Sequence, residues 1–144
     1  MSHQIIPVLI LSVQTLPNVL FLKEMQAKGV KMNKIIFISS KKMKEEGRGD
    51  WILLAAGLKG KVQVQEIEVA AEDYRQAKID IQKHQHDPLA FYYVNLTGGT
   101  KTMSMAAYDF YRAQADCRCF YMPIGGKAIQ RIYPDHDLVN LTVQ

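Results

Sequence analysis

The sequence predicts an α/β protein with a Rossmann-like, mostly parallel sheet of about six strands and helices on both faces. Three observations favour this fold: short apolar runs alternate with helix-like segments, turn residues separate them, and the last two apolar runs follow one another without a helix between them. The Gly125-Gly126 pair joins these last two runs, which predicts a C-terminal β-hairpin. With 144 residues, 48% of them hydrophobic, we expect one domain over residues 1–144.

The predicted strands are apolar or alternating runs between polar segments. Their ranges are residues 8–13, 34–40, 62–69, 89–96, 118–122 and 128–133. The fourth run is the most hydrophobic, whereas the third alternates apolar and polar residues as a half-exposed strand does. In parallel sheets of this kind ligands bind at the carboxyl ends of the strands, so a binding site is expected there.

Helices are predicted between the strands, over residues 19–27, 51–58, 72–84 and 100–114. Pro17 precedes the first helix, and Asp50 is a candidate N-cap for the second, after a glycine-bearing loop at residues 47–50. In the last helix Met103 begins an inward apolar face. The basic run at residues 41–44 is followed by two glutamates, and we interpret it as a loop that either is solvated or attracts a phosphate.

The net charge, the apolar runs and the cysteines limit the kinds of partner and site that the sequence predicts. The net charge of +4 and the pI near 9.0 favour anionic partners, but they are too mild to indicate direct DNA binding. The apolar run at residues 5–13 is too short to cross a membrane and lacks the features of a signal peptide, so we expect a cytoplasmic protein. Cys117 and Cys119 would share one face of a strand as buried thiols, and no metal or cofactor is predicted.

The turn after the fourth strand is the most informative segment. Gly98 and Gly99 allow the backbone to turn sharply and to approach a ligand closely. Thr97 and Thr100 add hydroxyl groups, and Lys101 adds a charge at the start of a helix, where free N–H groups favour anions. These features suit a phosphate or a ribose, although a tight turn with a threonine cap is the alternative. The segment is not a Walker A loop, because a threonine and not a glycine precedes the lysine.

Polar side chains also follow the first two strands, and for Thr15 and Asn18 helix capping is the alternative role. Because the carboxyl ends of parallel strands meet at one edge, these groups predict one shared cleft. The predicted binding residues are Ser12, Gln14, Thr15, Asn18, Ser39, Ser40, Lys41, Thr97, Gly98, Gly99, Thr100, Lys101 and Met103.

The run NLTGGTKTM at residues 95–103 resembles the signature of CARF (CRISPR-associated Rossmann fold) domains, the sensor domains of type III CRISPR effectors. The polar turn at residues 12–18 and the order of elements fit the same family. The resemblance implies a homodimer that binds a cyclic oligoadenylate, most commonly cyclic tetra-adenylate, across its two-fold axis and so controls an effector in antiviral defence. Most such proteins carry an effector domain, and we expect none within these 144 residues.

The resemblance leaves a second function open. Some family members slowly cleave their own ligand as ring nucleases, which would make this chain a metal-independent phosphodiesterase. Ser12 and Lys101 occupy positions where such activity could reside. No other catalytic residue is predicted, since the four histidines show no compelling Ser–His–Asp order. A purely structural interaction domain, which would bind no nucleotide, is the third possibility.

Overall fold

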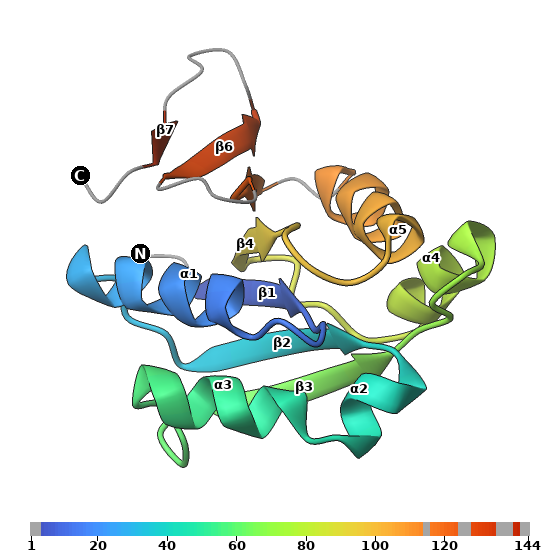
Figure 1. The fold of residues 1–144 in the computed structure, drawn as a ribbon. Helices are drawn as coiled ribbons and strands as arrows, with labels where there is room; N and C mark the ends of the chain where they lie inside the picture. Colours follow the sequence, from blue (N-terminus) through green and yellow to red (C-terminus); the bar gives the residue numbers. More distant parts are fainter. Residues whose placement is uncertain (1–3, 114–115, 124–127, 135–139, 142–144) are drawn as a thin grey trace.

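The computed structural model describes residues 4–113, 116–123, 128–134 and 140–141, and it confirms the Rossmann-like α/β fold (Figure 1). Its strands form one sheet in the order β3-β2-β1-β4-β5-β6-β7. They are β1 (Ile5–Ile10), β2 (Lys34–Ser39), β3 (Gln63–Glu68), β4 (Phe91–Asn95), β5 (Cys117–Tyr121), β6 (Ile129–Tyr133) and β7 (Asn140–Leu141). The pairs among β1 to β5 are parallel, whereas β6 is antiparallel to both β5 and β7. The predicted hairpin is therefore confirmed, and the two-residue β7 is an addition to the predicted strands.

Helices cover both faces of the sheet, as predicted. They are α1 (Leu16–Ala27), α2 (Lys41–Glu45), α3 (Arg48–Ala56), α4 (Tyr74–Gln82) and α5 (Lys101–Arg112). One apolar core joins α4 and α5 to one face, with Ile10, Val94 and Tyr111 among its members. The other core joins α1, α2 and α3 to the opposite face through residues such as Leu9 and Phe37. The alternation of side chains along each buried strand supplies both cores at once.

Two predicted loops are wrong. The basic run forms the short helix α2, because Ser40 accepts a hydrogen bond from the Met43 amide and the Met43 side chain is buried in the core. The glycine-bearing segment belongs to α3, whose N-cap is Gly47 with a φ of +67°, so Asp50 lies inside the first turn and is not the cap. Gly49 is buried there, and a Cβ on it would lie 3.0 Å from the ring of Phe37.

The order of the strands creates a place for a ligand. From β1 the chain passes through α1 to β2 on one side, and from β4 it passes through α5 to β5 on the other side. The helices α1 and α5 lie on opposite faces (Figure 1). The adjacent carboxyl ends of β1 and β4 therefore form a topological switch point, where sheets of this kind bind their ligands.

Two further expectations concern the state of the two cysteines and the presence of a membrane-spanning helix. Cys117 and Cys119 are buried on the same face of β5 with their sulfur atoms 3.9 Å apart, and neither forms a disulfide. No helix within the described ranges combines the length and the apolar run that a bilayer span requires. Gln114, the predicted end of the last helix, and the turn at Gly125-Gly126 lie outside the described residues.

Candidate functional site at the ends of β1 and β4

The turn after β4 lies directly against the end of β1. Gly98 and Gly99 have φ angles of +105° and +68°, a region that residues with a side chain rarely adopt. A Cβ on Gly99 would lie 2.4 Å from Cγ2 of Ile10, and one on Gly98 would lie 2.9 Å from the Ile10 carbonyl oxygen. Both glycines are therefore required by conformation and by space, and their backbone is left open for close approach by a ligand.

The threonines of this turn hold it in shape. Thr97 Oγ1 accepts a hydrogen bond of 2.8 Å from the Met122 amide. Thr100 is the N-cap of α5: its Oγ1 accepts from the Met103 amide at 3.1 Å and donates to the Ala71 carbonyl. Their hydroxyl groups are thus used within the protein, and both residues position the turn.

A buried asparagine pair connects the turn to α1 and β1. Asn18 Nδ2 donates to the Ile10 carbonyl and Asn95 Nδ2 donates to Asn18 Oδ1, both at 2.9 Å. Asn95 Oδ1 in turn accepts from the Thr97 amide at 3.1 Å. Asn95 was not among the predicted residues, although a polar residue that ends the most hydrophobic strand is a visible signal.

The turn after β1 contributes the polar side chains that face outward. Ser12 Oγ donates to the Gln14 carbonyl at 2.9 Å and would lie 3.3 Å from a Cβ on Gly98, so the turns after β1 and β4 meet. Gln14 is exposed, and Thr15 occupies the N-cap position of α1 without a capping hydrogen bond from its side chain. Arg48 also reaches this turn, because its Nη1 donates to the Val13 carbonyl at 3.3 Å. The sequence carries no signal for that contact.

The residues after β2 divide between the interior and the surface. Ser39 is fully buried, and its hydroxyl has no hydrogen-bond partner among the described residues. Ser40 caps α2, and exposed Lys41 lines, with Ser40 and Ala71, an open groove of about 580 Å³. Since Ala71 receives the Thr100 hydrogen bond, this groove borders the glycine turn.

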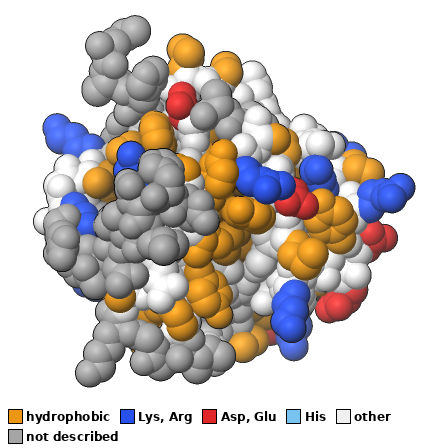
Figure 2. All heavy atoms as spheres, turned by 90° about the horizontal axis from the view of Figure 1, so that it is seen from above, with side chains coloured by type: hydrophobic (Ala, Val, Ile, Leu, Met, Phe, Trp, Pro, Cys, Tyr) orange, Lys and Arg blue, Asp and Glu red, His pale blue; other side chains and the backbone are white. Residues whose placement is uncertain are grey.

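A second groove of about 610 Å³ runs from the glycine turn along α5. Gly98, Gly99 and Lys101 line it, and most of its other lining residues are apolar or aromatic, among them Met105 and Tyr121. Figure 2 shows a band of hydrophobic side chains on the face that it draws, with Lys and Arg side chains beside the band. The arrangement combines an anion-attracting helix start with an apolar surface.

Eight of the thirteen predicted site residues fall into two groups, and the other five belong to neither: Thr15, Ser40, Lys41, Thr97 and Thr100. Ser12, Gln14, Gly98, Gly99 and Lys101 come together at the edge between β1 and β4, where an anionic ligand can reach them. The second group consists of Asn18, Ser39 and Met103, whose side chains are buried. Within the described part of the chain, no three His, Cys, Asp or Glu side chains lie close enough to hold a metal ion.

Comparison with known proteins identifies the family. The family model of the Card1 CARF domain matches residues 6–143. No curated protein sequence matches the chain. Among solved structures, Can2 from Sulfobacillus thermosulfidooxidans in complex with cyclic tetra-adenylate has a TM-score of 0.73 at 21% identity, over 96% of this chain and 37% of that one.

Two further structures share the fold. Protein VC1899 from Vibrio cholerae has a TM-score of 0.71 at 17% identity, over 97% of this chain and 36% of that one. A type III CRISPR defence DNA nuclease activated by cyclic oligoadenylate has a TM-score of 0.58 at 14% identity, over 92% of this chain and 20% of that one. This chain thus spans little more than a third of the length of the first two structures and a fifth of the length of the third. Because the family model covers nearly all of the sequence, the chain belongs to the CARF family, in its Card1 branch.

Proposed function

We propose that this chain is a sensor domain for a cyclic oligoadenylate, with cyclic tetra-adenylate as the ligand, and that it controls an effector in type III CRISPR antiviral defence. The observation that carries the proposal is the glycine turn at the switch point, where Gly98 and Gly99 lie against Ile10 and Lys101 is exposed beside them. Membership of the CARF family and the likeness to Can2 bound to cyclic tetra-adenylate support the choice of ligand.

The chemistry of the site suits the phosphates of such a ring. The first amides of α5 have no partners within the helix, and the helix start carries a partial positive charge. Lys101 at the first helical position opposes the helix dipole, an arrangement that becomes favourable when an anion is bound. Ser12 and Gln14 on the neighbouring turn offer hydrogen bonds to a ribose or a base.

We further propose that two copies of the chain bind one ring. A cyclic oligoadenylate with an even number of units has two-fold symmetry, so a symmetric dimer would present the same contacts to both halves. The groove along α5 is the proposed interface, because Met105 is 58% exposed and Tyr121 is 40% exposed. Burying this apolar surface would bring the two glycine turns to one shared cleft.

Calorimetric titration with cyclic tetra-adenylate tests the proposal, with linear tetra-adenylate as the matched control. The two ligands have the same bases and differ in closure, so only a site shaped for a ring separates them. We expect one ring to bind per two chains and the linear form to bind more weakly. An absence of binding by either ligand would refute the sensor function and favour a structural interaction domain.

Ring cleavage is the alternative function, and the contact between the two turns is the observation that favours it. Ser12 lies beside Gly98, and Gly98 lines a groove together with Lys101, where these groups could hold a ribose 2′-hydroxyl in line with its phosphate. Incubation with cyclic tetra-adenylate, followed by chromatography, distinguishes the two functions. Linear products would establish a ring nuclease, and intact ligand after many hours would rule it out.

A further inference from the structure

The glycine turn has a groove on either side, and the two grooves lead in different directions. The groove along α5 leads toward β5 and β6, since Tyr121 and Ile132 line it, and it is the proposed dimer interface. The groove of about 580 Å³, here named the outer groove, lies over the carboxyl ends of β2 and β3, where Ser40 and Glu68 line it. A ring centred on the two-fold axis would therefore direct its bases toward the outer groove.

A hydrogen bond connects the outer groove to the glycine turn. Thr100, the N-cap of α5, donates to the carbonyl group of Ala71, and Ala71 lines the groove. The turn itself lies against β1, because Gly98 packs on the Ile10 carbonyl. Adjacent strands lie about 4.8 Å apart, so the two spacings from β1 to β3 cover about 10 Å, which one nucleotide can span. A nucleotide with its phosphate at the turn can thus place its base in the outer groove.

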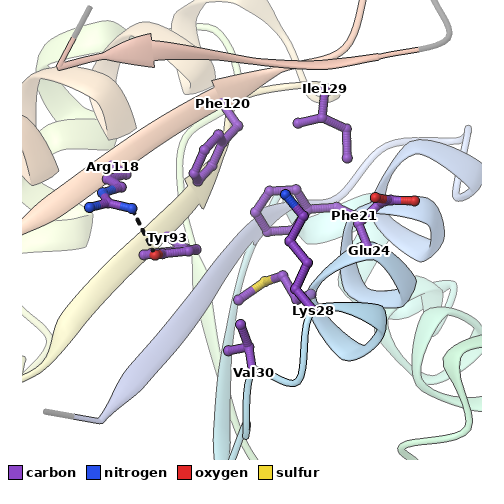
Figure 3. A pocket seen from close by; sticks show the side chains of 9 residues that line it. Phe21, Glu24, Lys28, Val30, Tyr93, Arg118, Phe120 and Ile129 are labelled. Atoms are coloured by element: carbon purple, nitrogen blue, oxygen red, sulfur yellow. Dashed lines mark hydrogen bonds between the residues drawn. The ribbon is translucent and has the colours of Figure 1, made fainter. Parts of the chain in front are cut away.

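The cavity between α1 and the sheet offers no comparable place for a base (Figure 3). Its volume is about 210 Å³, and it shares no lining residue with the outer groove. Phe21 and Phe120 are 3% and 1% exposed, and their rings are tilted by 51° to one another. No flat face of these rings is therefore open to a ligand, whereas the outer groove is open and borders the candidate site.

Two carboxylates line the outer groove, and they differ in their contacts. Asp80 Oδ2 accepts from the Ala70 amide at 3.0 Å, and Asp80 Oδ1 accepts from Gln76 Nε2 at 2.9 Å. The Glu68 side chain is 46% exposed, and its ion pair with Lys44 has a distance of 3.9 Å between Oε1 and Nζ. A long, exposed ion pair of this kind contributes little to stability. The Glu68 carboxylate can therefore accept a hydrogen bond from a ligand, whereas both oxygens of Asp80 already have donors.

The charge of Glu68 restricts what it can bind. Lys41 and Lys42 also line the outer groove and attract an anionic ring, whereas Glu68 repels it. An ionised carboxylate only accepts hydrogen bonds, so a favourable contact needs a donor on the ligand. The 6-amino group of adenine is such a donor, whereas guanine carries a carbonyl oxygen at that position.

We infer that Glu68 selects adenine by accepting a hydrogen bond from its 6-amino group in the outer groove. This inference rests on the proposed function, because the base reaches the groove when the ring is bound at the glycine turn. Ala70 and Ala71 line the same groove, and their small side chains leave room for a purine. Each chain of the proposed dimer contributes one such contact, so two of the four bases of cyclic tetra-adenylate are selected.

A cyclic tetranucleotide in which purine replaces adenine tests the inference, because purine lacks only the 6-amino group. In calorimetric titrations the wild-type chain should bind cyclic tetra-adenylate about tenfold more tightly than the purine ring, the factor that one hydrogen bond to a charged group provides. In Glu68→Ala the two rings should bind with equal affinity. The ratio of the two affinities is the readout, because removing a negative charge strengthens the binding of both anionic rings alike.

Glu45→Ala is the matched control variant. Glu45 is an exposed acid on α2 that lines neither groove beside the glycine turn, so its replacement should leave the wild-type ratio unchanged. Equal binding of the two rings by the wild-type chain, or a wild-type ratio in Glu68→Ala, would overturn the inference and leave the sensor function standing. Binding of neither ring would refute the sensor function and this inference with it.

Discussion

Lys101 is the exposed charge beside the glycine turn, and its replacement tests a direct contact with a ligand phosphate. Lys101→Ala should weaken cyclic tetra-adenylate binding by roughly 1.5–3 kcal/mol for each contact, the range for a hydrogen bond to a charged group. A dimer would lose two such contacts for each ring. The free energy of unfolding should hardly change, because an exposed lysine at a helix start adds little stability.

Calorimetry on Lys101→Ala and on the control Lys23→Ala checks this prediction. Lys23 is exposed on α1 and lines none of the grooves beside the glycine turn. Unchanged affinity in Lys101→Ala would mean that the ligand binds elsewhere.

Gly99 tests the close approach of the turn to β1, and Gly29 provides a matched control. Both have positive φ angles, so an alanine at either position carries the cost of a left-handed conformation, about 1–2 kcal/mol. Only at position 99 would the new Cβ collide with Ile10; at position 29 nothing lies within 4 Å. Gly99→Ala should therefore lose cyclic tetra-adenylate binding and be destabilised more than Gly29→Ala, as measured by titration and urea denaturation. Equal behaviour of the two variants would show that the turn does not depend on this contact.

Single residues show how far a sequence can predict a site. The glycine pair was predictable, because only glycine commonly adopts such φ angles and because the pair sits between a strand and a helix. The role of Asn18 was not predictable, since its side chain points inward only once β1 and β4 are neighbours. Ser39 likewise ends a buried strand, and the pleat of β2 turns it into the interior.

The side chain of Asn18 connects three elements, because it lies on α1 and bonds to residues of β1 and β4. Asn18→Ala would leave the Ile10 carbonyl and the Asn95 amide group buried without these partners, at a cost of about 1–3 kcal/mol in the free energy of unfolding. Cyclic tetra-adenylate affinity should also fall, because the Asn95–Thr97 contact that shapes the turn loses its support. Urea denaturation and calorimetry measure the two effects. Thr15→Ala is the control for stability, since Thr15 makes no capping bond; equal stability losses in both variants would contradict the account.

His86 lies in the segment between α4 and β4, where its ring packs against Tyr92 of β4 and Tyr111 of α5. Its Nδ1 lies 2.8 Å from the His84 carbonyl and its Nε2 lies 2.8 Å from the Tyr111 hydroxyl, so the neutral ring can donate to the first and accept from the second. Burial is the main cause that lowers the pKa of His86 below its ordinary value of 6.5, with repulsion from His84 and Lys34 as smaller causes. The folded state therefore resists protonation more than the unfolded state does.

The stability of the protein should therefore fall as the pH drops through 6.5, because the unfolded chain gains a proton that the folded chain binds less readily. His86→Gln removes this proton uptake and should flatten the dependence between about pH 7.5 and 5.5. Denaturation midpoints at several pH values measure it. An identical slope in the variant would show that other groups cause the dependence.

The short helix α2 and the first turn of α3 show why some helical segments are missed in a sequence. Glycines at positions 47 and 49 favour a loop in the sequence. In the structure Gly47 joins α2 to α3, and Gly49 lies inside α3. Position 49 favours glycine because a side chain there would press on the ring of Phe37. A glycine required by packing looks the same in a sequence as a glycine required by a turn. The two-residue β7 is likewise shorter than any apolar pattern can indicate.

In the molecule as a whole, the order of the strands determines where the candidate site lies. The mostly parallel sheet, the two-sided helices and the hairpin could be predicted from alternating patterns. The pairing of β1 with β4 could not be predicted, because it joins residues 86 positions apart in the sequence, such as Val8 and Val94. That pairing places the turns after β1 and β4 side by side.

The proposed dimer predicts that a charge in the groove along α5 separates the two chains. Met105→Glu should shift the protein from dimer to monomer in sedimentation, because an unpaired carboxylate would be buried in an apolar interface. Leu54→Glu is the control, because Leu54 is a similarly exposed apolar residue on α3, at the opposite face of the sheet. A wild-type chain that stays monomeric with and without ligand would contradict the dimer, and dissociation by Leu54→Glu alone would contradict its placement.

The proposed sensor function requires cyclic tetra-adenylate to bind at the switch point between β1 and β4. Backbone amide chemical shifts of the isotope-labelled protein, followed during titration with this ligand, report the position of binding as well as its strength. We expect the largest changes at Gly98, Gly99 and Lys101, accompanied by changes at Ser12 and Gln14 on the facing turn. Saturable binding whose shifts leave these five residues unmoved would contradict it.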